Sequence, residues 1–142
     1  MVAQLMGQTP QETTINASHR RYVTPTGAYS NRGTTWADAK NNIQDAINDL
    51  VASHLLPGEV WVKEGTYRPT ESTESGGSSL FASFKIPAGI TVRGGFAGNE
   101  VTLNDRMVKY IDKDGKTVGT AKIGDTFDKD YTEKRFLHPT IL

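Results

Sequence analysis

The three histidines are the side chains best suited to bind a metal or move a proton, but their spacing favours neither. His19, His54 and His138 lie 35 and 84 residues apart, whereas local metal motifs place their ligands a few residues apart. His54 falls at the end of an expected helix, where the helix dipole stabilises positive charge. We therefore expect His54 to act in capping or packing, and we predict no histidine metal site.

Acidic residues suggest calcium binding, but the spacing favours a turn. The run Asp112-Lys113-Asp114-Gly115 begins like a calcium loop, yet an EF-hand needs glycine sixth and glutamate twelfth, and Ile123 is twelfth here. Asp-Gly is a common hairpin pair, so we predict a turn. A weak calcium site is the open alternative, and no other cofactor is predicted. Its further oxygens would come from Asp125, Asp128 and Asp130.

No pair of carboxylates is placed for catalysis. Glu59 and Glu64 flank an expected strand, and Glu71 and Glu74 lie in a Ser- and Gly-rich segment. A catalytic pair must instead be held at a fixed separation on rigid elements. The chain has no cysteine, which excludes disulfides, thiolate metal sites and thiol nucleophiles. The sequence predicts no catalytic residue and no enzymatic activity in this chain.

Aromatic side chains can bind sugars by stacking, but those in expected helices and strands are more often buried. We expect a structural role for Trp36, Trp61, Tyr67 and Phe96. Tyr22 and Tyr29 lie in or beside expected loops, and they are the candidates for exposed ligand contacts.

The run Gly94-Gly95-Phe96-Ala97-Gly98 shares only its glycine content with a phosphate loop. It lacks the Gly-x-Gly-x-x-Gly order, the Lys-Ser/Thr ending and a following helix. We predict a structural corner, in which Gly94, Gly95 and Gly98 supply backbone angles that need positive φ.

Charge and composition exclude several classes of function. Sixteen basic and sixteen acidic residues give zero net charge, whereas nucleic-acid and anionic-membrane binding rest on clustered Lys and Arg. No apolar run approaches the roughly 20 residues that cross a bilayer. Residues 1–8 lack the charged and apolar regions of a signal peptide. We expect one globular domain without a membrane span, from which any leader peptide has been removed.

The clearest predicted element is an amphipathic helix over residues 35–54. Thr35 is a suitable N-cap with Asp38 three residues later, and Pro57-Gly58 ends the pattern. Apolar residues recur at the spacing of one helix face. Those expected to cover the core are Trp36, Ile43, Ile47 and Leu50.

Around the helix the sequence predicts short strands and turns. Residues 1–20 form a flexible arm by composition, 69–79 a flexible loop and 124–135 a charged loop. A hairpin is expected from 107–111 and 117–120. Strands are expected at 21–24, at 59–63 (with Val60, Trp61 and Val62), at 66–68 after a bend, and at 81–86, 90–93 and 136–142.

Several of these motifs follow one another in an order that carries information. They are Tyr22–Gly27, Thr35–Ala39, Ile43–Ile47, Gly58–Thr70 (which contains Gly65 and Tyr67), Gly94–Glu100 and His138–Leu142. Their order resembles the entry segment of bacterial surface proteins with a pectin-lyase-like, right-handed parallel β-helix. The resemblance covers residues 21–100 and, more weakly, 136–142.

The resemblance implies a mainly β fold with one amphipathic helix, forming the N-terminal cap and first coils of a parallel β-helix. Residues 21–100 would form the cap, and residues 101–142 an excursion or hairpin followed by the start of the next coil. The last residues, Thr140-Ile141-Leu142, predict a chain cut within a coil.

The expected function is that of a non-catalytic cap in a secreted or cell-surface protein, adhesin-like, that binds glycans or host surface proteins. Expected partners are the rest of the β-helix or another polypeptide at the C-terminal edge, and nucleic acid is not expected. Two alternatives stay open. One is a polysaccharide lyase or glycoside hydrolase with catalytic residues downstream, and the other is a subunit of a surface or phage assembly.

Overall fold

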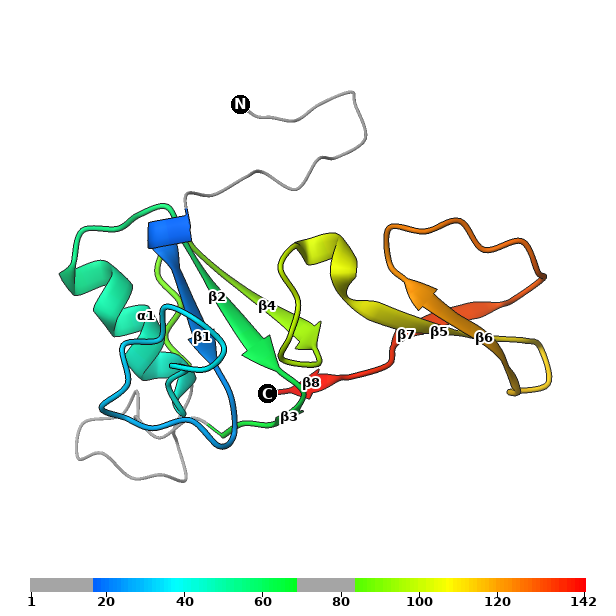
Figure 1. Cartoon of the computed structure of the whole chain (residues 1–142), viewed down its shortest axis with the longest axis horizontal. Coiled ribbons are helices and arrows are strands. Elements are labelled where there is room, and N and C mark those ends of the chain that lie inside the picture. Colours follow the sequence, from blue (N-terminus) through cyan, green and yellow to red (C-terminus); the bar gives the residue numbers. More distant parts are fainter. Residues whose placement is uncertain (1–16, 69–83) are drawn as a thin grey trace.

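The computed structural model describes residues 17–68 and 84–142, which form a mainly β structure with one α-helix (Figure 1). The predicted loop 69–79, residues 1–16 of the predicted arm and residues 81–83 of a predicted strand lie outside this part. Helix α1 is Ile43–Ala52, and 3-10 turns cover Ala17–His19 and Leu103–Asp105. The strands are β1 (Arg20–Val23), β2 (Gly58–Lys63), β3 (Gly65–Thr66), β4 (Ile90–Phe96), β5 (Met107–Ile111), β6 (Thr117–Lys122), β7 (Glu133–Phe136) and β8 (Thr140–Ile141).

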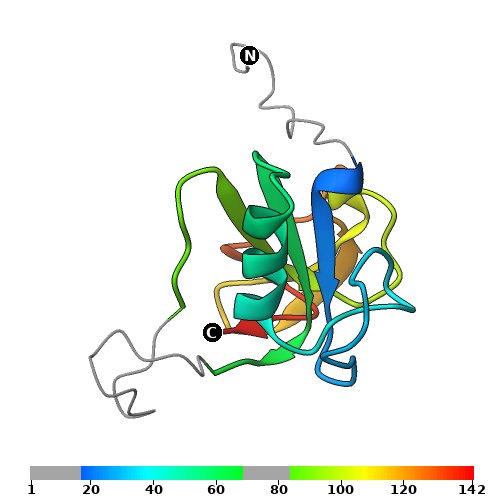
Figure 2. The same cartoon turned by 90° about the vertical axis from the view of Figure 1, so that its left-hand side faces the viewer.

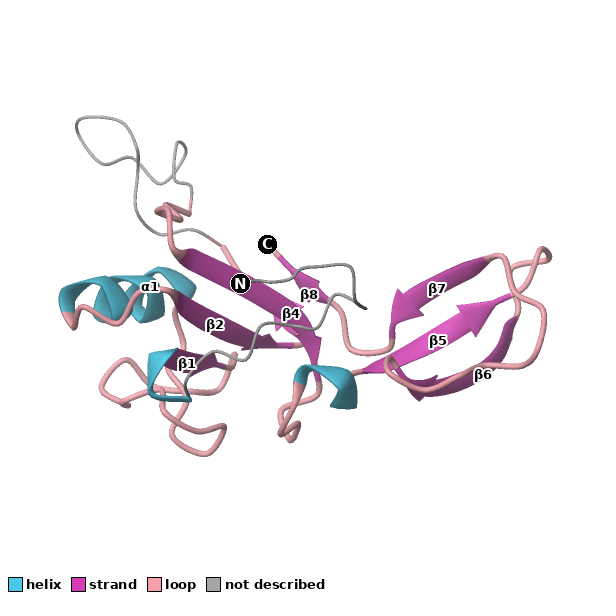
Figure 3. Cartoon of the chain, turned by 90° about the horizontal axis from the view of Figure 1, so that it is seen from above, coloured by secondary structure: helices cyan, strands magenta, loops and turns pink. Residues whose placement is uncertain are grey.

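The strands form three small sheets. β1, β2 and β4 lie side by side in parallel, with β2 in the centre. β3 and β8 form a parallel pair, and β5 is the central strand of an antiparallel sheet between β6 and β7. Figure 3 shows the antiparallel sheet beyond the carboxyl ends of β2 and β4, at the opposite end of the molecule from α1.

Helix α1 covers one face of the β1-β2-β4 sheet (Figure 2). Alternation along β2 directs Val60 and Val62 to this face, where they pack with Ile43, Ile47 and Leu50 of the helix. All five side chains are at most 2% exposed, so each contributes most of the 1.5–3 kcal/mol or so expected from burying an aliphatic side chain. This helix–sheet layer is the main core.

An aromatic cluster covers the opposite face of the same sheet. Trp61 stacks on Phe96 with ring centroids 4.6 Å apart, and Tyr22 meets Trp61 edge-on at 5.7 Å. Trp36 lies 4.7 Å from Tyr22 and donates its indole N–H to the Glu100 carbonyl at 2.9 Å. The sequence pattern predicts Trp36 on the helix face with Ile43, but Trp36 lies in a loop on the other side of the sheet.

The helix begins eight residues later than predicted, at Ile43, with Asn42 as its N-cap. The predicted cap, Thr35, does accept the Asp38 N–H at 3.0 Å, but this forms only an isolated turn. Between the predicted and the observed start, the backbone of Lys40 pairs with β1. The Lys40 N–H donates to Tyr22 O, and Lys40 forms a β-bridge with Val23. A residue paired with a strand has no free groups for a helix, so the helix starts after Lys40.

Three further predictions are corrected by the structure. Gly94 and Gly95 lie within β4, which extends to Phe96, and the corner follows them. Residues 84–86 are irregular. The last residues of the charged loop predicted at 124–135 form the start of β7. Lys134 and Arg135 of this strand pair with β5, although they do not alternate with apolar residues.

Candidate functional site

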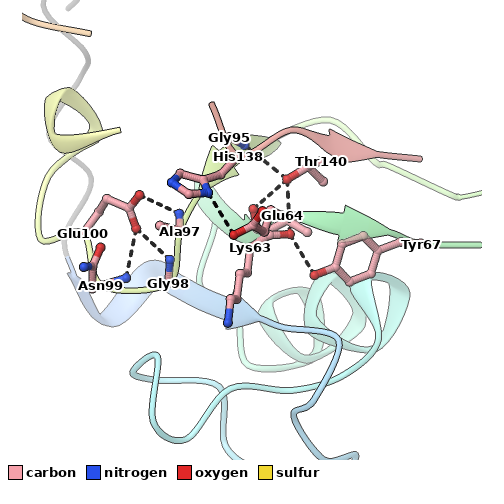
Figure 4. A network of polar contacts seen from close by, with 11 residues as sticks. Lys63, Glu64, Tyr67, Gly95, Ala97, Gly98, Asn99, Glu100, His138 and Thr140 are labelled. Atoms are coloured by element: carbon pink, nitrogen blue, oxygen red, sulfur yellow. Dashed lines mark hydrogen bonds and ion pairs between the residues drawn. The ribbon is translucent and has the colours of Figure 1, made fainter. Parts of the chain in front are cut away.

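The candidate site is the junction where β2 turns into β3 and where β4 approaches β8 (Figure 4). The Glu64 N–H, at the turn, donates to Phe96 O at 2.7 Å. Gly65 N–H then donates to Pro139 O at 3.1 Å, and Tyr67 N–H donates to Ile141 O at 2.8 Å. Backbone pairing therefore continues around the corner from the first parallel sheet into the second.

The Thr140 side chain connects β8, on which it lies, with β2 and β4. Its hydroxyl oxygen lies 2.9 Å from Val62 O and accepts the Gly95 N–H at 3.1 Å. A side chain at Gly94 would meet Thr140, because a Cβ there would lie 2.7 Å from the Thr140 Cβ. Gly95 has φ +85°, which disfavours other residues. The glycines predicted to form a corner thus allow β4 and β8 to approach each other.

Two side chains from the corner itself add further contacts. The Tyr67 hydroxyl donates to Lys63 O at 2.8 Å, and burial raises the pKa of Tyr67. His138 Nδ1 lies 2.9 Å from a Glu64 carboxylate oxygen, linking the segment before β8 to the end of β2. These contacts join β2, β3 and β8.

The turn after β4 is built around the buried Glu100 carboxylate, which is 5% exposed. It accepts the N–H groups of Ala97, Gly98 and Asn99 at 2.6, 2.9 and 3.0 Å, and Gly98 has φ +105°. The negative charge replaces solvent for three backbone donors that the turn leaves without strand partners. Glu100 is the structural residue of this turn that the glycine pattern alone did not single out.

One outer edge of the β1-β2-β4 sheet is closed by the chain itself. Tyr22 N–H donates to Gly33 O at 2.7 Å and Tyr22 O accepts from Lys40 N–H at 2.9 Å. Thr24 N–H then donates to Lys40 O at 2.9 Å. The loop between β1 and α1 therefore occupies the hydrogen-bonding groups that β1 turns away from β2.

The opposite edge is different. Within residues 17–68 and 84–142, no strand pairs with the outer side of β4 or of β8. Ile141 and Leu142, at the end of the chain, are 54% and 58% exposed. Arg106 donates to Gly94 O at 3.0 Å near the end of β4. Within the described residues, the β1-β2-β4 sheet thus has one edge closed by a loop, at β1, and one edge without a strand partner, at β4.

A groove of about 610 Å³ lies between α1 and residues 85–87. Gln44 forms part of its wall, and its amide accepts Lys85 N–H at 2.7 Å and donates to Lys85 O at 3.0 Å. Val51, Ala52 and Ile86 contribute apolar surface. The Gln44 amide therefore fastens residue 85 to the helix, and it adds no reactive group to the groove.

The two tyrosines predicted to contact a ligand have different environments. Tyr29 is 72% exposed, with the Lys40 ammonium 5.9 Å from its ring centre. Tyr22 is partly buried in the aromatic cluster between Trp36 and Trp61, so its ring faces are less available than predicted, while its hydroxyl contacts Arg20.

The acidic residues considered as calcium ligands do not form a cluster of metal ligands in the described structure. Asp112 accepts the N–H groups of Asp114 and Lys116 at 2.9 and 3.0 Å, which forms the predicted hairpin turn. In the part of the chain that the structure describes, no three His, Cys, Asp or Glu residues gather as metal ligands, and no helix has the length and apolarity to cross a bilayer.

The geometry of the junction suits joining strands more than chemistry on a substrate. Its carboxylates, Glu64 and Glu100, are engaged with His138 and with backbone N–H groups, respectively. Comparison of the chain with protein-family models, with curated proteins and with solved structures found no match in any of the three.

Proposed function

We propose that this chain is a non-catalytic N-terminal cap of a right-handed parallel β-helix. The observation that carries the proposal is the difference between the β1 and β4 edges of the three-stranded parallel sheet. The loop from residue 24 to residue 42 closes the β1 edge, whereas β4 and β8 have no strand partner on their outer sides within the described residues. A solenoid needs this asymmetry at its first coil, because one end must be sealed and the other must stack.

The order of the parallel pairs supports the proposal. β2 is followed directly by β3, and β4 is followed, after an excursion, by β8. β4 pairs with β2 and β8 pairs with β3, each in parallel. Two successive passes of the chain therefore lie in the same order and direction, as two coils of a solenoid do, with residues 101–135 inserted into the second pass.

The location and partners follow from the family that the sequence resembles. A cap of this kind would belong to an exported, adhesin-like protein at a bacterial surface, whose later coils bind glycans or host surface proteins. The immediate partner would be the next coil of the same polypeptide, or a strand of another chain, on β4 and β8. The apolar side chains of Ile141 and Leu142 favour an apolar partner at this end.

Hydrogen exchange tests the proposal by comparing this chain with a longer protein in which the natural sequence continues beyond Leu142. The Tyr22 and Thr24 amides should be protected in both. The outward-facing β4 amides should exchange freely in the chain alone and about a hundredfold more slowly once the next coil pairs with them. Exchange of these β4 amides that is equally fast in both proteins would contradict the proposal.

Self-association gives a second test on the chain alone. If the unpartnered edge recruits strands, Ile141→Lys should weaken concentration-dependent association in light scattering, because charge on an edge opposes strand pairing. Val51→Lys is the matched control, since Val51 is 40% exposed on α1. Equal effects of the two lysines would show that association does not use the β4 and β8 edge.

A further inference from the structure

The two outer strands of the antiparallel sheet differ in their charge. β6 and β7 lie on opposite sides of β5 (Figure 3). β7 carries the charged residues Glu133, Lys134 and Arg135. In β6 only the last residue, Lys122, is charged, and its ammonium lies 3.4 Å from an Asp105 carboxylate oxygen. Because charges on an edge strand oppose pairing with another chain, β7 is protected against such pairing and β6 is not.

The middle of β6 directs backbone hydrogen-bonding groups away from the sheet. The Ile123 N–H donates to Arg106 O at 2.8 Å, so residue 123 directs its backbone groups toward β5. These groups alternate in direction along an antiparallel strand, so those of Ala121 also face β5 and those of Thr120 face outward. Among the described residues, no strand pairs with this side of β6, and Thr120 is exposed. The N–H and C=O of Thr120 are therefore available to a further strand.

A second copy of β6 fits this edge in the antiparallel orientation. In the register centred on Thr120, each Thr120 lies opposite its counterpart, and the two residues exchange N–H···O=C bonds in both directions. Lys122 of each copy then lies opposite Val118 of the other copy. Beyond the strand, Lys116 comes opposite the position that precedes Asp125. The pairing therefore sets no like charges directly opposite each other and brings opposite charges to adjacent positions.

The equivalent pairing of β7 is unfavourable. The Leu137 N–H donates to Met107 O at 2.9 Å, so alternation directs the backbone groups of Arg135 toward β5 and those of Lys134 outward. When two copies of β7 pair through their outward groups, the registers that overlap most of the strand set either Lys134 or Arg135 opposite its own counterpart. Like charges directly opposite each other destabilise a strand pair. Charge complementarity therefore selects β6 as the edge that a second copy can join.

We propose that β6 is a self-association edge, at which a second copy of this chain adds its own β6 in antiparallel orientation with Thr120 facing Thr120. The two antiparallel sheets then continue into each other across a two-fold axis. The contact is short compared with the roughly 1,600 Å² buried in stable complexes, so the association is weak and forms where copies are concentrated. This contact goes beyond the proposed capping function and does not use a following coil.

Sedimentation velocity of the whole chain at concentrations up to about 1 mM tests the proposal. Every protein carries Ile141→Lys, which opposes pairing at the β4 and β8 edge. Thr120→Pro removes the outward N–H and leaves the bonds between β6 and β5 in place, so it should weaken dimerisation at least about tenfold. Lys134→Pro makes the same change on β7 and should alter dimerisation less than about twofold. Melting temperatures verify that both variants fold.

A pair of charge variants tests the register without proline. Thr120→Lys and Thr120→Glu should each weaken dimerisation about tenfold, because each sets like charges opposite each other when Thr120 faces its counterpart. An equimolar mixture of the two variants sets lysine opposite glutamate and should recover the parent affinity to within about threefold. This recovery is specific to a contact in which residue 120 of one copy meets residue 120 of the other.

Several results would overturn the proposal. They are a chain that stays monomeric at every concentration, association that Ile141→Lys alone abolishes, a folded Thr120→Pro variant that dimerises like the parent, equal losses in Thr120→Pro and Lys134→Pro, and a mixture of the charge variants that recovers nothing. The hydrogen-exchange test of the capping function follows β1 and β4 and does not involve β6. Failure of one proposal is therefore distinguishable from failure of the other.

Discussion

The parallel and antiparallel parts of this chain bury their strands to different degrees. Residues Gly58 to Val62 of β2 are all buried, because α1 covers one face of the sheet and the aromatic cluster covers the other. In the antiparallel sheet the buried side chains of β5 are Val108, Tyr110 and Ile111, and β7 is mostly exposed. A strand that is covered on both faces is wholly buried, whereas the stability of a strand in the antiparallel sheet depends on the burial of a few side chains.

The largest expected effect comes from breaking the helix–sheet layer. Ile47→Asp places a charge where the side chain is 0% exposed, and it should lower the free energy of unfolding by about 4 kcal/mol or more. Val51→Asp, on the exposed side of the same helix, should cost less than about 1 kcal/mol. Urea denaturation measures both, and similar losses would contradict the role of α1 as the cover of the sheet.

Removing an aromatic side chain from the antiparallel sheet should have a smaller and local effect. Tyr110, 2% exposed, stacks on Phe127 with centroids 3.8 Å apart. Tyr110→Ala should cost about 3 kcal/mol and raise exchange of β5–β7 amides while β1 and β2 stay protected. Tyr29→Ala, at a residue 72% exposed in the loop between β1 and α1, is the control. Loss of protection throughout the chain would mean that the two parts unfold together.

The junction between the parallel sheets should respond to a single hydroxyl. Thr140→Val keeps the shape of the side chain and removes its contacts with Val62 O and Gly95 N–H, at a cost of about 1–2 kcal/mol. Thr120→Val changes an exposed threonine of β6 and serves as the comparison. Equal melting temperatures for the two variants would show that the Thr140 hydroxyl does not stabilise the junction.

The smallest expected effect concerns pH and the turn before β5. The Asp105 carboxylate accepts the Thr102 and Val101 N–H groups, and the bond from Thr102, followed by that from Val101 and the nearby Lys122, lowers its pKa. The folded pKa therefore lies below the unfolded value. The contribution of Asp105 is fully present above the unfolded pKa and disappears as the pH falls through the folded one.

This dependence can be measured by NMR titration of Asp105 and by the acid limb of the stability curve. Asp105→Asn should remove the contribution of Asp105 and leave the rest of the curve unchanged. An Asp105 that titrates at or above its ordinary value would contradict the folded geometry of this turn.

The local sequence pattern correctly predicts those helices, strands and turns whose contacts in the fold favour the same structure. The alternation of Val60, Trp61 and Val62 predicts β2, the apolar stripe through Ile47 predicts the helix, and Asp114-Gly115 predicts the hairpin between β5 and β6. In each case the local preference and the burial of the side chains favour the same structure.

Long-range backbone pairing explains what the pattern missed. Lys40 has good helix propensity but pairs with β1, and Lys134 and Arg135 have no strand alternation but pair with β5. The same reason applies to the junction: Gly65 and Gly95 stand out as glycines, whereas the role of Thr140 depends on strands 45 or more residues away in sequence. Such partners are visible only once the chain is folded.

The excursion between β4 and β8 begins and ends at nearly the same point. Leu137 N–H donates to Met107 O at 2.9 Å, and Val108 pairs with Phe136. The segment between these residues is therefore a closed loop in space, and its length has little influence on the position of β8. We therefore expect that a segment of different length can replace the residues between Val108 and Phe136 without displacing β8.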